Sequence, residues 1–197
     1  MKTALIVLGV IALILVIGVA SLVGVYNGFV AADQSVNEKW AQVQNVYQRR
    51  ADLIPNLVET VKGFAAQEKS VLEAVTQARA SASGIKATPE LLNDPAAFKK
   101  FQDAQNQLGG ALSRLLVTVE RYPELKSNQN FLALQSQLEG TENRITVERQ
   151  RFNEAVREYN TKIKLMPGAL MARVMGFKEK AFFESAPGSE TAPKVKF

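Results

Sequence analysis

The sequence predicts an all-α protein in which an N-terminal transmembrane helix precedes an up-and-down four-helix bundle with long, coiled-coil-like helices. Two observations predict this fold. Residues 4–25 form an unbroken apolar run in which Ser21 is the only side chain able to form a hydrogen bond. Beyond it, apolar side chains recur every three, four or seven positions, and no alternating run of β-branched residues is long enough to indicate a strand.

The apolar run is long enough to cross a membrane. As a helix rising about 1.5 Å per residue it spans about 33 Å, against roughly 30 Å for a bilayer core. The alternative is a cleavable secretory signal that starts at Lys2 and is cut after Ala20 or Ala32. Because the run exceeds the roughly 7–15 apolar residues usual in such signals, we interpret residues 1–27 as a retained anchor.

Charges flanking the anchor predict its orientation. The amino terminus and Lys2 outweigh the far flank, where Asp33 and Glu38 come before Lys39. The cytoplasmic side carries the excess of Lys and Arg, so we expect a cytoplasmic N-terminus, a single pass and a bulk domain outside the cytoplasm. The absence of cysteine suits that compartment.

A stripe of small residues on the anchor predicts self-association. The stripe recurs every four positions and lets helices approach closely; it consists of Ala20, Gly24 and Gly28. Ordinary glycine usage in a membrane helix is the alternative. Because single-pass anchors all point the same way, we expect a cyclic homo-oligomer of parallel subunits.

Composition bounds the rest of the chain. Without the anchor about 170 residues remain, which suits one domain with its own core. The net charge of +5 lies at the C-terminal end, because residues 162–197 carry 7 Lys or Arg against 3 Glu. No basic stripe with interleaved aromatic side chains is present, so nucleic acid is not an expected partner, whereas a lipid bilayer is.

The first half of the domain predicts two helices. A stripe with a seven-residue repeat, Phe29, Val36 and Val43, indicates a first helix over 28–50. Pro55 disfavours helix at the preceding residue, so we expect the chain to reverse at 52–56 and a second helix to run over 53–81. If Pro55 only kinks one long helix, three helices replace four.

The second half predicts two more helices. Residues 81–93 lose periodicity and read as a surface loop, after which Asp94 caps a third helix with Pro95 in its first turn. Gly109-Gly110 interrupts this helix, so either a neighbouring helix comes close there or the helix bends. Ser127 or Asn128 caps the fourth helix, which repeats large apolar residues every seven positions from 131 to 166 and stops at Pro167.

Four blocks of the sequence resemble a known family. They are RRADLIPNLVETVKGFAAQEK at 49–69, ERYPELKSNQNFLALQ at 120–135, LEGTENRI at 138–145, and FNEAVREYNTKI at 152–163 with the following MPG and GF. In this order they resemble the LemA proteins of bacteria. The resemblance implies a short cytoplasmic N-terminus, one helix through the bacterial plasma (inner) membrane and a helical bundle over 28–166. It implies no catalytic activity.

The side chains present exclude most enzyme chemistry. The chain has no histidine and no cysteine, so it lacks the residues for His or Cys nucleophilic triads, usual zinc sites and the Glu-x-x-His pairs of di-iron bundles. We therefore expect no catalytic residues, no cofactor and no metal site. An enzyme that uses carboxylates alone is the weakest of three functional hypotheses.

Polar residues on or beside the apolar seams are the first candidate site. They either form a polar layer that fixes which helices pair or line a partner-binding surface; they are Arg50, Glu68, Gln105, Glu142, Asn143 and Arg144. Counting turns from the expected reversal places Glu68 at the level of Gln105 and of 142–144. We therefore expect Arg144 to be the partner of Glu68.

The C-terminal segment 167–184 is the second candidate site. Residues 169–183 are predicted to form a basic amphipathic helix near the headgroups, which contacts either lipid or its own bundle or a neighbouring subunit. The contact residues are Leu170, Arg173, Val174, Phe177, Lys178 and Lys180. Residues 185–197 are expected to be a flexible tail.

The predicted function is that of a non-enzymatic, membrane-anchored scaffold or interaction module of the bacterial cell envelope, which self-assembles. The alternative is a membrane-remodelling or lipid-binding protein that acts through the basic C-terminal helix. The sequence leaves open the biological process, the protein partners and the number of subunits.

Overall fold

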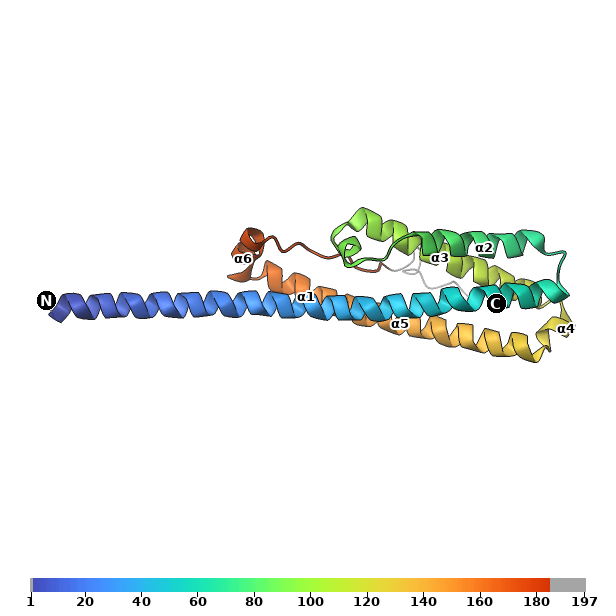
Figure 1. Ribbon diagram of the computed structural model, residues 1–197, viewed down its shortest axis with the longest axis horizontal. Helices are drawn as coiled ribbons and strands as arrows, with labels where there is room; N and C mark the ends of the chain where they lie inside the picture. The colour runs from blue at the N-terminus through green and yellow to red at the C-terminus, as the bar shows by residue number, and fades with distance from the viewer. Residues whose placement is uncertain (1, 185–197) are drawn as a thin grey trace, which may run out of the picture.

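A computed structural model describes residues 2–184, and within them the chain is helical with no strand. The helices, shown in Figure 1, are α1 (Lys2–Phe64), α2 (Lys69–Gly84), the short 3₁₀ helix η1 (Pro89–Asn93), α3 (Pro95–Val119), α4 (Pro123–Lys126), α5 (Gln129–Lys164) and α6 (Gly168–Met175). The all-α prediction is confirmed. The predicted tail, 185–197, lies outside the described residues.

Helix α1 joins the anchor to the domain without a break. Its N-terminal part projects alone beyond the other helices (Figure 1), and its apolar side chains from Leu5 to Val23 are exposed. The chain has one described helix long and apolar enough to cross a membrane, with a mean hydropathy of 3.1 in its most apolar window. From Phe29 onward the same helix carries a buried stripe.

Two hydrophobic clusters hold the domain together. Helix α1 packs along α5, and α2 packs along α3. In the cluster nearer the anchor, the fully buried Trp40 ring contacts the rings of Phe98, Phe101 and Phe152 at centroid distances of 5.4–5.8 Å. The second cluster lies towards the distal end, around Leu57, Leu108, Leu115 and Phe131. Each fully buried side chain of this size contributes about 1.5–3 kcal/mol.

The predicted reversal at Pro55 is wrong. Pro55 lies inside α1, which continues to Phe64, and the chain turns at 65–68 instead. A proline in a helix leaves the carbonyl four residues earlier without its N–H donor, and that carbonyl belongs to Ala51. Arg79 of α2 supplies the missing bond, since its Nε donates to the Ala51 oxygen at 2.8 Å. A contact from another helix therefore allows α1 to pass through Pro55.

The shifted turn also overturns the predicted partner of Glu68. Glu68 directly precedes α2 at the distal turn, where its Oε1 accepts hydrogen bonds from Arg121 Nη2 at 3.0 Å and from the Tyr122 hydroxyl at 2.7 Å. Because the true turn comes about ten residues after Pro55, the count from 52–56 placed Glu68 too far down the helix. Arg144 is exposed and is not its partner.

The starts of α3 and α5 follow their predicted caps. The Asp94 carboxylate accepts hydrogen bonds from the backbone N–H groups of Ala96 and Ala97, both at 3.0 Å, and the Asn128 side chain accepts from Phe131 N–H at 3.0 Å.

The predicted surface loop 81–93 is partly wrong, because α2 extends to Gly84 and Leu92 of η1 is fully buried. A Cβ atom added at Gly109 or Gly110 meets no described atom of another helix within 4 Å, so neither glycine is required by a close contact with a neighbouring helix.

Candidate functional site: the anchor-side face

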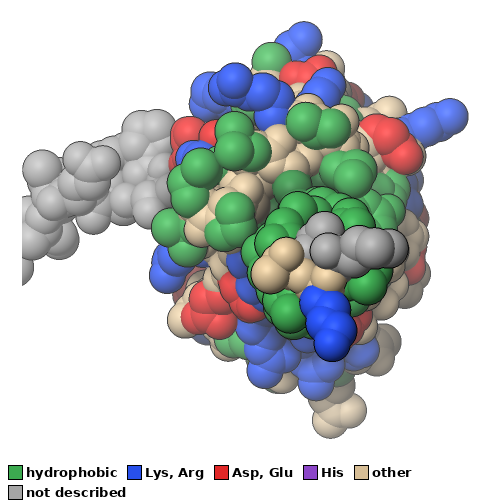
Figure 2. All heavy atoms as spheres, turned by 90° about the vertical axis from the view of Figure 1, so that its left-hand side faces the viewer, with side chains coloured by type: hydrophobic (Ala, Val, Ile, Leu, Met, Phe, Trp, Pro, Cys, Tyr) green, Lys and Arg blue, Asp and Glu red, His purple; other side chains and the backbone are tan. Residues whose placement is uncertain are grey.

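The end of the domain beside the anchor carries exposed apolar side chains. We call this surface, made by residues 165–178, the anchor-side face. Five of its apolar side chains are more than half exposed: Leu165, Met166, Leu170, Val174 and Met175. In Figure 2, which views the molecule from the anchor end, apolar side chains gather next to α1. A contiguous apolar surface of this kind marks a contact with lipid or protein.

Cations surround this apolar surface. Lys162 Nζ lies 2.7 Å from Glu158 Oε1, and Lys164 Nζ lies 2.7 Å from Glu179 Oε2. Such exposed pairs contribute only about 0–1 kcal/mol, so both ammonium groups can exchange partners. Arg173 and Lys178 form no ion pair within residues 2–184. The face therefore combines exposed apolar side chains with available positive charge.

The predicted helix over 169–183 is too long. Helix α6 ends at Met175, and Gly176 has a φ of 77°, in the left-handed region that favours glycine. Residues 177–184 then run back along the domain without helical structure, as Figure 1 shows. We call these residues the strap. The helical periodicity of 170–181 therefore describes a helix over only its first half.

Three side-chain amides hold the strap by its backbone. Each accepts a hydrogen bond from the N–H of one strap residue and donates one to the carbonyl of the same residue, at 2.8–3.1 Å. The pairs are Asn160 with Lys180, Asn153 with Phe183 and Gln102 with Glu184. The Phe183 ring then lies 4.9 Å from the Phe98 ring in the core. The strap is thus an integral part of the domain.

Lys180, predicted as a membrane or subunit contact, is buried instead. Its Nζ lies 2.8 Å from Asp33 Oδ1 of α1 and 5.3 Å from the centroid of the Tyr159 ring. The Tyr159 hydroxyl donates to the Lys178 carbonyl at 3.0 Å. Burial, and to a lesser extent the Asp33 carboxylate, raises the pKa of Tyr159 to about 12. The periodicity assigned Lys180 to an exposed face because it assumed a helix there.

Phe177 also turns inward. Its ring lies 5.2 Å from that of Phe29 and 6.1 Å from that of Tyr26, both in α1. Helix α6 is therefore fixed at both ends, by α5 before it and by the strap after it. Of the six predicted contact residues, Leu170, Arg173, Val174 and Lys178 remain exposed. The fold presents them next to the place where α1 leaves the domain.

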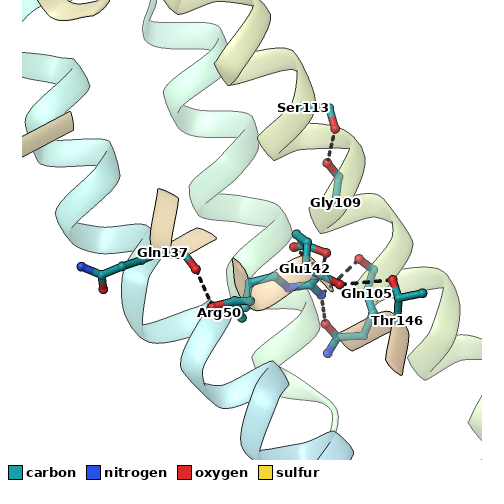
Figure 3. A network of polar contacts seen from close by, with 8 residues as sticks. Arg50, Gln105, Gly109, Ser113, Gln137, Glu142 and Thr146 are labelled. Carbon is teal, nitrogen blue, oxygen red and sulfur yellow. Dashed lines mark hydrogen bonds and ion pairs between the residues drawn. The ribbon is translucent and has the colours of Figure 1, made fainter. Parts of the chain in front are cut away.

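The predicted polar layer is only partly assembled. Arg50, whose side chain is 3% exposed, donates from Nη1 to both oxygens of Glu142 at 3.0 and 3.3 Å and from Nη2 to the Gln105 side chain (Figure 3). These three residues come from α1, α5 and α3. Asn143 and Arg144 are exposed, and Glu68 lies at the distal turn. A buried cation thus links three helices.

Sequence reasoning missed Asp33, Gln102, Asn153 and Asn160. A signal for two of them was present, because Asn153 and Asn160 lie seven residues apart, each directly after an apolar seam residue.

The small-residue stripe on the anchor is open: a Cβ atom added at Gly24 or Gly28 meets no atom within 4 Å, and Ala20 is exposed. Within the described residues, no group of three or more acidic side chains is placed to hold a metal ion.

Comparisons with known proteins give the family. The model of the LemA family matches residues 39–197. The chain is 29% identical to the magnetosome protein MamQ of Magnetospirillum gryphiswaldense, over 93% of this chain and 76% of the relative. It is also 29% identical to the magnetosome proteins MamQ 1 and MamQ 2 of Paramagnetospirillum magneticum, over 88% of this chain and 70% of each relative. Since the family model spans most of its length, this chain belongs to the LemA family.

Proposed function

We propose that this protein is a non-enzymatic, membrane-anchored interaction module of the bacterial cell envelope, in which α1, α2, α3 and α5 act as an up-and-down bundle. The observation that carries the proposal is the continuity of α1. Because one helix forms both the apolar anchor and a wall of the core, no flexible linker separates membrane and domain. The bundle is held upright, and its anchor-side face lies against the bilayer surface.

The packing of the residues that follow the anchor argues against signal cleavage after Ala32. Phe29 and Ala32 are 3% and 5% exposed, and Phe29 packs against the Phe177 ring. Signal cleavage after Ala32 would remove Phe29 and open the core. We propose a single pass through the plasma (inner) membrane with a cytoplasmic N-terminus, as the charge flanks indicate. A fluorescent reporter that matures only in the cytoplasm, fused after Phe197, is then dark, and a bright fusion would overturn this orientation.

A scaffold suits the side chains of this chain better than an enzyme does. With no histidine or cysteine in the chain, chemistry would rest on carboxylates. The partly buried ones within the described residues serve as ion-pair partners: Asp33 of Lys180, Glu68 of Arg121, Glu142 of Arg50 and Glu148 of Arg151. The relatives are magnetosome proteins by name, and we propose that this chain is likewise a membrane-associated protein without catalytic activity. Cross-linking in native membranes, followed by mass spectrometry, tests the scaffold role by the partners it identifies.

Self-assembly through the anchor is part of this proposal. The open stripe of Ala20, Gly24 and Gly28 suits close contact between parallel anchors in a cyclic oligomer. Gly24→Ile should shift detergent-solubilised protein to a smaller species in light scattering without changing the thermal unfolding of the domain. A monomeric wild type under gentle extraction would exclude assembly, and an unchanged Gly24→Ile oligomer would move the contact to the bundle or to α6.

Lipid binding through α6 is the second candidate function. The exposed apolar residues Leu170 and Val174, which are 62% and 83% exposed, favour it together with Arg173 and Lys178. Removing residues 165–197 is a poor test, because the strap is part of the core. The double variant Leu170→Gln, Val174→Gln keeps the strap. Reduced deformation of liposomes by this variant, at unchanged thermal stability, favours lipid action over partner binding.

A further inference from the structure

An apolar groove lies between the end of the anchor and the junction of α5 with α6. Its volume is about 280 Å³. One wall comes from α1 and the other from the residues that join α5 to α6, and the lining residues include Val25, Gly28, Phe29, Leu165, Met166 and Pro167. Leu165 and Met166 are 61% and 69% exposed, so the groove is open to its surroundings although its lining is apolar.

Two glycines shape this groove. A Cβ atom added at Gly168 would lie 2.8 Å from the Phe29 ring and 2.8 Å from the Lys162 carbonyl oxygen, so only glycine allows α6 to start this close to α1. At Gly28, by contrast, an added Cβ meets no atom within 4 Å. The missing side chain at Gly168 lets α6 pack against α1 and close the floor of the groove, and the missing side chain at Gly28 leaves one side of the groove open.

The position of the groove in the chain sets its depth. Val25 is the last residue of the apolar run and also lines the groove, so the opening lies where the hydrocarbon region ends. Tyr26, which is 41% exposed, follows directly, and tyrosine is enriched at this level of a membrane. Lys162 lines the rim with its apolar stem, while its ammonium group pairs with Glu158.

We propose that this groove binds part of an acyl chain of a membrane phospholipid, whose headgroup lies at the charged rim beside Lys162. The inference rests on the membrane placement proposed above. An apolar surface at this depth meets lipid before any other molecule. At about 30 Å³ for each water-sized group, a volume of about 280 Å³ holds a segment of several methylene groups but not a whole lipid. Such a lipid is held between anchor and bundle, apart from those that surround the anchor.

The test uses the full chain in liposomes that contain a phospholipid with a photoactivatable acyl chain. After irradiation, peptide mass spectrometry measures the label on residues 165–168. Gly28→Leu fills the groove, and leucine is a better helix former than glycine, so the variant should fold. We expect it to lower that label roughly tenfold, which corresponds to the lost contacts of about two methylene groups. Gly24→Leu places the same side chain in the small-residue stripe one turn away but outside the groove, so it is the matched control for any effect of altered anchor packing on the label.

The outcomes separate this inference from the proposed function. Loss of label in Gly28→Leu, with full label in Gly24→Leu, supports the groove. Equal labelling of 165–168 in both variants overturns it while leaving the anchor-side face at the membrane. If neither these residues nor Leu170 and Val174 are labelled even in the wild type, the face does not lie against the bilayer and the proposed function fails with it. Unchanged thermal unfolding of Gly28→Leu confirms that the loss is local.

Discussion

The contact between Arg79 and the Ala51 carbonyl predicts a coupling that mutations can measure. Pro55 cannot donate to that carbonyl, and Arg79 does so at 2.8 Å. Arg79→Met keeps the apolar stem but removes the donor, which leaves a half-buried carbonyl without a partner. In Pro55→Ala, the new N–H at position 55 bonds the same carbonyl within the helix. The loss of Arg79 should therefore matter with proline at 55 and matter little with alanine there.

The magnitudes follow from the geometry. A carbonyl left unpaired costs about 1–3 kcal/mol, and because this one is only partly buried we expect about 1.5 kcal/mol for Arg79→Met. Interior proline costs about 3 kcal/mol; Arg79 offsets part of this, and the stiffer unfolded chain offsets about 0.4–1 kcal/mol more. Pro55→Ala should thus stabilise the domain by about 1 kcal/mol. In that background Arg79→Met should cost less than about 0.5 kcal/mol.

Thermal and denaturant unfolding of the four proteins, followed by circular dichroism, completes the cycle. For a domain of this size 1 kcal/mol corresponds to about 2–4 °C in Tm, so Arg79→Met should lower Tm by roughly 3–6 °C in the wild-type background and by less than about 2 °C with Pro55→Ala. Equal losses in the two backgrounds would refute the coupling. A destabilised Pro55→Ala would show that the proline is required for the shape of α1.

Three further predictions concern buried polar contacts. Glu142→Ala leaves the buried Arg50 charge without its carboxylate partner and should lower the free energy of unfolding by about 2 kcal/mol. This is less than the roughly 3–5 kcal/mol typical of a fully buried ion pair, because Glu142 is half-exposed. Arg50→Met should lower the free energy of unfolding by less in the same unfolding assay, and the reverse order would contradict the network. Asn160→Ala removes both bonds to the strap at Lys180 and should speed cleavage within the strap by trypsin, whereas equal cleavage would exclude a clamp. Burial raises the pKa of Tyr159, so the unfolded chain loses the phenol proton near pH 10 and the folded chain near pH 12. The free energy of unfolding should therefore decrease as the pH rises from about 10 to about 12. Tyr159→Phe should remove this contribution to the decrease, and a pH profile identical to that of the wild type would contradict the prediction.

The periodic pattern predicted the helical elements better than their ends. Heptad spacing correctly indicated long helices, and Asp94 and Asn128 cap as their types predict. The rule for Pro55 is also physically correct, but it describes an isolated helix. The contact that overrides it comes from Arg79, 24 residues away, and becomes visible only when α2 lies beside α1. The error at Glu68 then followed from the wrong starting point for the count.

The candidate sites show the same limit. Arg50, Gln105 and Glu142 were singled out because a polar residue beside an apolar seam either pairs or faces solvent, and these three lie together. The prediction of a helix from the amphipathic spacing of the C-terminal segment is wrong after Gly176. Such spacing does not reveal that a segment leaves the helix and is held by its backbone. Lys180 and Asp33 lie far apart in the sequence, so their pairing depends on the packing of the strap on α1.

The position of the anchor-side face against the bilayer is the most direct test of the proposed function. Because the chain has no cysteine, single cysteines can carry a fluorophore at Val174 on that face and at Val117 near the distal end, which are 83% and 72% exposed. The labelled full chains are reconstituted in liposomes with a lipid quencher at headgroup level. We expect strong quenching at Val174 and none at Val117. Equal quenching at the two positions, or none at either, would contradict this expectation.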